Sequence, residues 1–234
     1  MSTTLGTRIK KTASKTALAA MVGAAALAGS IGLASTASAE MYGDPDAAAQ
    51  YWQLQNYDNC ALMAVADVVG ELSGEPVSER EIINVATNTA SEAHPGSIYI
   101  KPAHLTDPNS GQGTDSRDIV VLLEQYGINA VITSEEVADK PDSIPTGLDA
   151  LAGYLDDGHK VIAGVNAETI WNVAGDRTYA DHAVVVTGID TTEGVVHLND
   201  SGIEDGRDEQ VSIKTFAAAW ATSDNTMVVT VETS

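Results

Sequence analysis

An abrupt change of charge at Glu40 is the feature that most constrains what this chain can fold into. Residues 1–39 contain four basic residues and no acidic one, and residues 16–34 form an uncharged run rich in Ala and Gly. Small residues, Ala-Ser-Ala, occupy positions 37–39. This order is typical of a secretory signal peptide, so we expect residues 1–39 to be cleaved off and the protein to be secreted, outside the cell or into its envelope. A membrane anchor is the rival interpretation, but Ala and Gly insert into bilayers less readily than Leu and Ile.

Removal of residues 1–39 would leave 195 residues with 8 Lys plus Arg against 33 Asp plus Glu, a formal charge of −25. Such a field repels phosphate backbones and anionic lipid headgroups, so we expect no nucleic-acid partner and no membrane partner after cleavage. The negative charge does not exclude neutral or cationic substrates. A chain of this length can bury about 70% of its unfolded surface in one core. We expect a linker over residues 40–50 and one domain over residues 51–234, whose oligomeric state the sequence does not define.

The spacing of apolar residues predicts helices mostly in the first part of this domain and strands mostly in the second. Gly70 or Gly74 can end the first helix and Gly127 the second, while Thr114 or Asp115 can cap the second. This order favours an α+β fold in which N-terminal helices pack on an antiparallel C-terminal sheet. The predicted helices cover residues 59–70, 115–127, 148–158 and 213–220, and the predicted strands cover residues 128–133, 161–165, 183–189, 195–199 and 227–231.

Two segments have no regular hydrophobic pattern. Residues 90–113 contain Pro or Gly at six positions. Loops of this length are often lids or binding loops, although a plain surface excursion is an equal alternative. The acidic run at residues 204–209 could suggest a bound cation, but its spacing does not fit a calcium-binding loop. We interpret it as a solvated turn, and we expect no metal and no cofactor.

Cys60 is the one cysteine of the chain, so it cannot form an intrachain disulfide, and no zinc-type spacing of Cys and His surrounds it. It lies at the start of the first predicted helix, where unpaired N–H groups and the positive end of the helix dipole stabilise a thiolate. A nucleophilic cysteine is therefore one interpretation of this position. A small buried hydrophobic residue is the other, since free cysteines are among the most buried residues.

A nucleophilic thiol needs a base, and His182 has the most suitable setting because it opens the apolar strand DHAVVVTG at the edge of the sheet. If residues 190–194 connect this strand to the next one in an antiparallel hairpin, Val184 lies opposite Asp200. His182 and Asp200 then share one face of the sheet as diagonal neighbours. A shift of one residue in register would place Asn199 there instead, and either side chain can orient a histidine. The other histidines are expected at the surface or in packing: His94, His104, His159 and His197.

The segment before Cys60 is polar, and Gln53 and Gln55 lie seven and five residues upstream of it. If this segment doubles back, a side-chain N–H of either glutamine and the backbone N–H of Cys60 would form an oxyanion hole. These residues combine into one hypothesis. Cys60 attacks a carbonyl as a thiolate, and His182 transfers the proton. Asp200 fixes the imidazole tautomer, while Gln55 holds the oxyanion.

The order of these motifs is similar to that of the papain-like cysteine peptidases of the double-glycine leader type and their secreted relatives. Gln-x-x-x-x-Cys opens a helix, Asp-His-Ala-Val-Val-Val-Thr-Gly forms a strand, and Leu-Asn-Asp follows a hairpin. The segment 213–220 also resembles the short helix that follows the acidic residue in that family. The resemblance covers residues 51 to about 230, nearly all of the chain that follows the predicted signal peptide.

The resemblance implies a papain-like fold and a stand-alone peptidase with peptide or protein substrates. Cys60 matches the nucleophile of the family, and His182 matches its base. Asp200 matches the residue that orients the base, and Gln55 matches the oxyanion residue. Two departures concern the local backbone. The frequent Cys-Gly-Pro is here Cys-Ala-Leu, and the frequent Asp-Pro is here Asp-Ser, with Ser201 in place of proline.

These observations favour a secreted cysteine hydrolase that cleaves peptide or isopeptide bonds through a thioester intermediate. Amidase and acyl-transfer chemistry use the same type of site, and fold likeness does not decide between them. The alternative from another class is a non-catalytic secreted binding protein on the same scaffold, with residues 90–113 as its contact surface. A reactive thiol at Cys60 would argue against that alternative.

Overall fold

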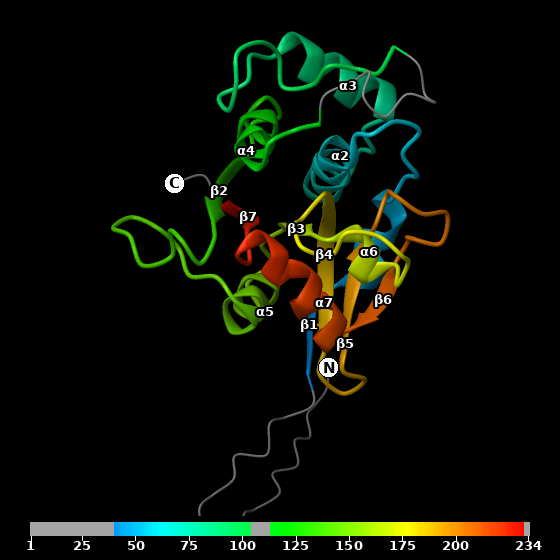
Figure 1. Cartoon of the computed structure of the whole chain (residues 1–234), viewed down its shortest axis with the longest axis vertical. Helices are drawn as coiled ribbons and strands as arrows, with labels where there is room; N and C mark the ends of the chain where they lie inside the picture. Colours follow the sequence, from blue (N-terminus) through cyan, green and yellow to red (C-terminus); the bar gives the residue numbers. More distant parts are fainter. Residues whose placement is uncertain (1–39, 104–112, 232–234) are drawn as a thin grey trace, which may run out of the picture. The chain divides into compact units, whose positions relative to one another are not determined.

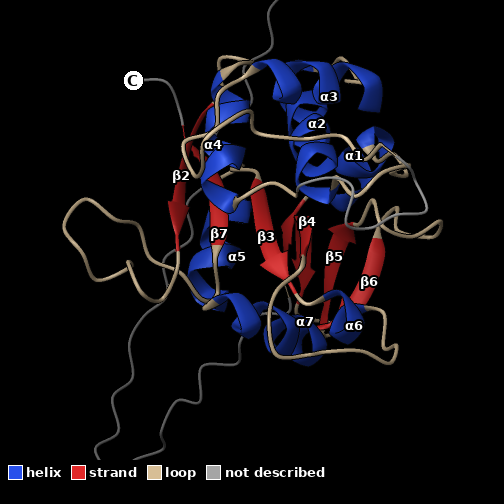
Figure 2. Ribbon diagram, turned by 45° about the horizontal axis from the view of Figure 1, so that its top comes forward, coloured by secondary structure: helices blue, strands red, loops and turns tan. Residues whose placement is uncertain are grey.

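An antiparallel sheet forms the centre of the protein, and helices cover both of its faces (Figure 1, Figure 2). The computed structural model describes residues 40–103 and 113–231. In these ranges the sheet has seven strands in the order β2-β7-β3-β4-β5-β6, and β1 pairs with β4. The strands are β1 (Met41–Gly43), β2 (Asn129–Thr133), β3 (Val161–Val165), β4 (His182–Asp190), β5 (Val195–Asn199), β6 (Glu209–Ser212) and β7 (Met227–Val231).

Alternate residues of the strands enter two separate hydrophobic cores, because successive side chains of a strand point to opposite faces. Ala183 and Val185 of β4 pack in the core that contains α2 and α4, whereas Val184 and Val186 pack in the core that contains α5 and α7. The helices are α1 (Pro45–Ala48), α2 (Cys60–Ser73), α3 (Glu79–Asn88), α4 (Ser116–Glu124), α5 (Leu148–Asp156), α6 (Ala167–Ile170) and α7 (Ile213–Trp220), with the 3-10 turns η1 (Ala49–Tyr51) and η2 (Ala221–Ser223).

The predicted fold class is confirmed, and the structure also contains elements that were not expected. The four expected helices, α2, α4, α5 and α7, and the five expected strands are present, and every pair of strands in the described residues is antiparallel. Gly74, in the left-handed conformation, ends α2, and the Asp115 side chain caps α4. Helix α3 and strand β6 were not predicted. Since β1 and β2 come from earlier parts of the chain, the sheet is not wholly C-terminal.

The expectation of a linker over residues 40–50 is wrong. Met41–Gly43 pairs with the end of β4, and Ala48 is only 1% exposed. Gly43 has a φ of +86°, and a Cβ at this position would collide with the carbonyl of Thr187, so the close approach of β1 to β4 requires glycine. A strand of three residues is too short to leave a hydrophobic period in the sequence, which explains why this segment resembled a linker.

Part of the irregular segment 90–113 belongs to the core. Ile98 and Tyr99 are fully buried, and the Asp118 carboxylate accepts a hydrogen bond of 2.6 Å from the Ser91 hydroxyl. The segment is therefore anchored to the domain at Ser91 and at residues 98–99. Residues 104–112, which include His104, lie outside the described residues, as does the predicted signal peptide. Within residues 40–103 and 113–231, no helix is both long and apolar enough to cross a bilayer.

Candidate active site

Cys60 is the first residue of α2, and this half-buried residue lines a cavity. The first N–H groups of a helix have no partner within it, so the backbone amides of Cys60 and Ala61 can face an anion beside the thiol. The sulfur is therefore placed where a thiolate and an oxyanion can both be stabilised, and it is not sealed in the core.

Glu79, in the first turn of α3, holds the loop that precedes Cys60. Its carboxylate accepts hydrogen bonds from the backbone N–H of Asn56 at 2.7 Å, from the Asn56 amide at 2.8 Å and from the Asn59 amide at 3.2 Å. Sequence reasoning missed this residue. The signal was present, because Ser78 and Glu81 have the spacing of a capping box, and the Ser78 hydroxyl accepts from the Glu81 N–H.

His182 and Asp200 form a buried hydrogen-bonded pair. His182 opens β4 and Asp200 directly follows β5, the next strand of the sheet. The imidazole Nε2 and the carboxylate Oδ1 are 2.7 Å apart, and Asp200 is completely buried. The structure therefore brings together the two residues that the hairpin argument placed on one face.

The hairpin reaches this arrangement by a different register from the one predicted. Thr191–Gly194 forms the connection, which is one residue shorter than expected, so the pairing next to the turn was predicted wrongly. A β-bulge at Thr187 corrects this difference in register. Beyond the bulge, Val185 opposes Asn199, as the predicted pairing of Val184 with Asp200 requires. The predicted placement of His182 beside Asp200 is thus found in the structure, although the turn was predicted wrongly.

Four further groups fix Asp200. Its Oδ1 also accepts from the Gly202 N–H at 2.7 Å, and its Oδ2 accepts from the Trp171 indole N–H at 2.8 Å. The Trp52 indole donates to the Asp200 carbonyl at 2.6 Å, and Gly206 accepts from the Asp200 N–H at 2.8 Å. Trp171 also lies against His182, with 5.1 Å between the ring centres. No sequence pattern pointed to either tryptophan, because both act through the tertiary fold.

The electrostatics of the pair favour the charged forms of both residues. Burial lowers the pKa of His182, but hydrogen bonds with Asp200 and Cys60 outweigh burial and raise this pKa to about 10. Burial also pushes the pKa of Asp200 upward, but the His182 imidazole and the N–H donors hold it below its usual range. On β6, burial and the Asp200 carboxylate raise the pKa of Glu209 to about 7. This site therefore favours an imidazolium next to the thiol.

Cys60 and His182 line the same cavity. The thiol also acts on the imidazole, because Cys60 is one of the groups that raise the pKa of His182. Because Nε2 of His182 bonds to Asp200, Nδ1 is the ring nitrogen left for the sulfur. Proton exchange between thiol and imidazole is therefore possible in this arrangement.

The two glutamines have different surroundings. The Gln55 N–H donates to the Ser201 carbonyl at 2.9 Å, and its side-chain Oε1 accepts from the Ser201 hydroxyl at 2.8 Å. Gln55 is thus attached to the residue after Asp200, but it is not among the described residues that line the cavity with Cys60. The Gln53 amide instead donates to the Val77 carbonyl at 2.8 Å. Ser201, which replaces the proline common in the resembling family, supplies the contact that holds Gln55.

Asn199 lies on the opposite face of the sheet from His182. Its side-chain N–H₂ donates to the carboxylate of Asp67 on α2 and to the Ala48 carbonyl. It is therefore bound to structural partners and not to the imidazole.

The remaining described histidines do not contact the Cys60–His182 pair. His197 bonds to Asp208 at 2.7 Å, and His159 packs edge-on against Tyr154. His94 lies on the wall of the cavity, 3.8 Å from the Asp118 carboxylate. In residues 40–103 and 113–231, no group of three or more His, Cys, Asp or Glu is arranged to hold a metal ion.

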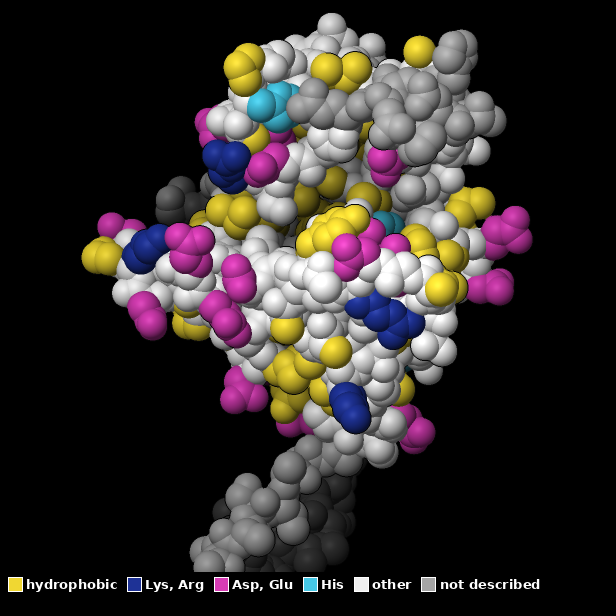
Figure 3. All heavy atoms as spheres, in the orientation of Figure 1, with side chains coloured by type: hydrophobic (Ala, Val, Ile, Leu, Met, Phe, Trp, Pro, Cys, Tyr) yellow, Lys and Arg dark blue, Asp and Glu magenta, His cyan; other side chains and the backbone are white. Residues whose placement is uncertain are grey.

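The cavity beside Cys60 has a volume of about 700 Å³ and is open to solvent. Figure 3 shows a hollow across the middle of this face with hydrophobic side chains on its walls. A volume of this order is typical of sites that bind several groups of a ligand at once. The thiol and the imidazole are thus accessible to a substrate.

A cysteine at the start of a helix, a histidine and an aspartate on adjacent antiparallel strands, and helices on both faces of the sheet define the class of papain-like cysteine peptidases. The sequence model of the Peptidase_C39 like family matches residues 46–228. The chain therefore belongs to this family, which confirms the expected resemblance.

Similar proteins include one from Mycobacterium tuberculosis that carries no functional description. It is 52% identical over 225 residues, which cover 94% of this chain and 97% of that protein. Among solved structures, a protein from Bacillus anthracis assigned as a C39-like peptidase has a TM-score of 0.55 at 16% identity, covering 83% of this chain and 99% of its own. A double glycine motif protease from an AMS/PCAT transporter, solved with a leader peptide, has a TM-score of 0.42 at 11% identity, covering 77% of this chain and 89% of its own.

Proposed function

We propose that the protein is a secreted cysteine hydrolase that cleaves peptide or isopeptide bonds. One observation carries the proposal: an accessible thiol at the start of α2 shares a cavity with an imidazole whose other nitrogen bonds to a buried carboxylate 2.7 Å away. A non-catalytic binding protein has no need of this combination. Membership of a peptidase family also supports a hydrolase.

The first half of the reaction forms a thioester. The Cys60 thiolate attacks the carbonyl carbon of the scissile bond, and the backbone N–H of Cys60 and the side-chain N–H₂ of Gln55 stabilise the negative oxygen. The imidazolium of His182 gives the Nδ1 proton to the leaving amine, and the C–N bond breaks. Asp200 holds the ring in position and favours its charged form throughout.

The second half releases the acid. Neutral His182 takes a proton from water, and the resulting hydroxide attacks the thioester carbonyl. The same N–H groups hold the second oxyanion. The C–S bond breaks, Cys60 leaves as the thiolate, and the proton remains on His182, so the original ion pair is restored.

Peptide cleavage tests this function. The purified protein is incubated with a mixture of synthetic peptides, and mass spectrometry detects new termini. We expect cleavage by the parent and none by Cys60→Ala, and hydroxylamine should trap the acyl group of the thioester as a hydroxamate. His197→Ala serves as the matched control, because His197 also bonds to an aspartate at 2.7 Å but lies outside the cavity. Equal product from the parent and from Cys60→Ala would contradict the proposal.

A further inference from the structure

The cavity beside Cys60 combines an apolar floor with an acidic rim. Ile119, Ile162 and Val228 line it and are almost fully buried, so they form the floor. Asp58, Asp115 and Asp181 also line it but are exposed to solvent, so their carboxylates lie at its rim. A ligand that fills the cavity therefore contacts hydrocarbon at the floor and negative charge at the mouth.

Little positive charge opposes these carboxylates. No Lys or Arg is among the described residues that line the cavity. Of the three aspartates, only Asp115 has an ion pair within the described part of the chain, with Arg117 at 2.9 Å. Asp181 accepts from the Ala167 N–H, which compensates its charge only in part. The rim therefore keeps a net negative charge.

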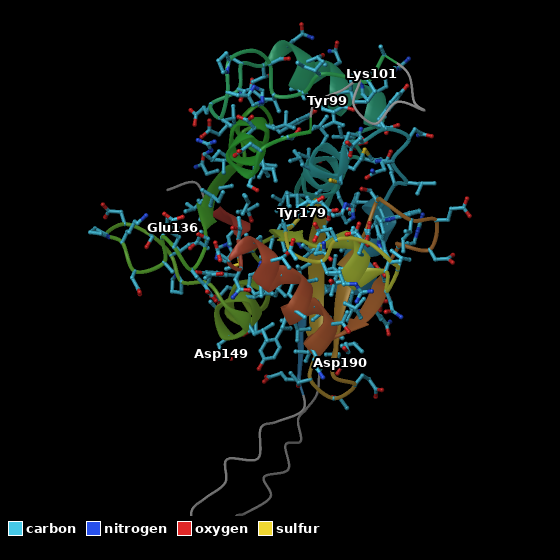
Figure 4. All side chains as sticks on the ribbon, viewed as in Figure 1. Tyr99, Lys101, Glu136, Asp149, Tyr179 and Asp190 are labelled. Carbon is cyan, nitrogen blue, oxygen red and sulfur yellow. The ribbon has the colours of Figure 1, made fainter. Side chains whose placement is uncertain are left out.

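An exposed aromatic ring completes the rim. Tyr179 lies on the loop between α6 and β4, lines the cavity and is 54% exposed (Figure 4). Its backbone is held, because the buried Asn166 side chain donates to the Tyr179 carbonyl at 2.9 Å. A tyrosine ring and carboxylates that line one cavity suit an ammonium or guanidinium group on an alkyl stem.

We propose that the enzyme prefers peptides that carry a Lys or Arg side chain next to the scissile bond. This inference rests on the proposed function and names its substrate class. The methylene stem packs on the apolar floor, and the cationic group reaches Asp58, Asp181 and, more weakly, Asp115. The strongly acidic chain after residue 39 would also attract such peptides from solution, because long-range opposite charge raises the rate of encounter.

Matched peptides test the preference. Three fluorogenic series place lysine, acetyl-lysine or glutamate at one position on either side of the scissile bond. Acetyl-lysine keeps the stem and removes the charge. We expect kcat/KM for lysine to exceed that for acetyl-lysine by about 10-fold or more at low salt, and the ratio to shrink as salt increases. Equal rates for lysine and acetyl-lysine would overturn the inference.

Aspartate variants locate the charge effect. Asp58→Asn and Asp181→Asn should each reduce the lysine preference by about 2- to 5-fold, as expected for partly exposed ion pairs. Asp115→Asn should reduce it less, since Arg117 already neutralises this carboxylate. Asp149→Asn is the matched control, because Asp149 lies on α5 outside the cavity (Figure 4). An unchanged preference in all three cavity variants would also overturn the inference.

Binding to the Cys60→Ala variant separates this inference from the proposed function. We expect the lysine peptide to bind this variant more tightly than the acetyl-lysine peptide. Absence of cleavage by the parent, with preferential binding of lysine, would remove the hydrolase and leave a cation-selective cavity. Cleavage without a preference for lysine would keep the hydrolase and remove the substrate class.

Discussion

Asp200 helps to raise the pKa of His182 through a short hydrogen bond and through its negative charge. Removing its negative charge should lower the pKa of the imidazole, which is raised to about 10 in the parent. Leaving-group protonation requires the imidazolium, so kcat/KM should fall at high pH as His182 loses its proton. In Asp200→Asn this basic limb should move to lower pH by about 1–3 pH units. The measurement is a pH profile of peptide cleavage, and an unmoved limb would show that Asp200 does not set the charge of the base.

Ser201 positions Gln55, and Gln55 is proposed to hold the oxyanion. Gln55→Ala should reduce kcat by about 10²–10³-fold with little effect on KM, because the interaction is made mainly in the transition state. Ser201→Ala leaves the amide in place but unanchored, so we expect a smaller loss, about 10-fold. Gln53→Ala provides the control, since its amide bonds to Val77 away from the site. If Gln53→Ala slowed kcat as much as Gln55→Ala, the oxyanion assignment would be wrong.

The residues with their own sequence signals were the ones that could be predicted. Cys60 stood at a helix start, and His182 opened an apolar strand. The position of Asp200 was predicted from the pairing of residues along a hairpin. The prediction held because the bulge at Thr187 compensated for the shorter turn. Trp171 could not be found in this way, since its contact with Asp200 joins residues 29 positions apart across unrelated elements.

Among the elements, those with a full hydrophobic period and a capping signal were predicted, and the short ones were not. Strand β3 has the expected bounds of 161–165, and α2 ends at one of the two glycines considered. Strands β1 and β6 have three and four residues, too few for an alternating pattern to be recognised. Helix α3 was not predicted, although Ser78 and Glu81 have the spacing of a capping box.

Helix α2 contains a buried carboxyl pair that should make the stability of the domain depend on pH. Burial and the nearby Glu71 raise the pKa of Asp67 well above its usual value. The folded state therefore binds more protons than the unfolded state above about pH 3.9, and stability falls as pH rises from there toward the folded pKa.

Asp67→Asn removes this dependence while keeping an acceptor for Asn199. We expect the variant to be more stable than the parent at pH 8, by about 1 kcal/mol or about 2–4 °C in Tm, and nearly equal to it at pH 4. Thermal unfolding followed by circular dichroism gives both values, with Asp149→Asn as the exposed control. Parallel Tm curves for parent and Asp67→Asn would contradict the predicted linkage.

For the whole molecule, the charge break falls directly before a residue that is hydrogen-bonded to the sheet domain, which suits processing at this point. The Glu40 N–H donates to the Thr191 hydroxyl at 2.8 Å, and β1 begins at Met41. We propose that the protein is exported and cleaved after Ala39. N-terminal sequencing of protein from the culture fluid should give Glu40 as the first residue. A double variant, Ala37→Leu with Ala39→Leu, should block cleavage because small residues are needed at both positions. Recovery of the parent only inside cells, with residues 1–39 attached, would contradict the proposal.

The rate of Cys60 alkylation by iodoacetamide near neutral pH most directly tests whether His182 activates the thiol. The parent should react faster than free glutathione, and His182→Ala should lower the rate by at least about 10-fold, because it removes the imidazolium that stabilises the thiolate. His197→Ala should react like the parent. Equal rates for the parent, His182→Ala and His197→Ala would contradict the account.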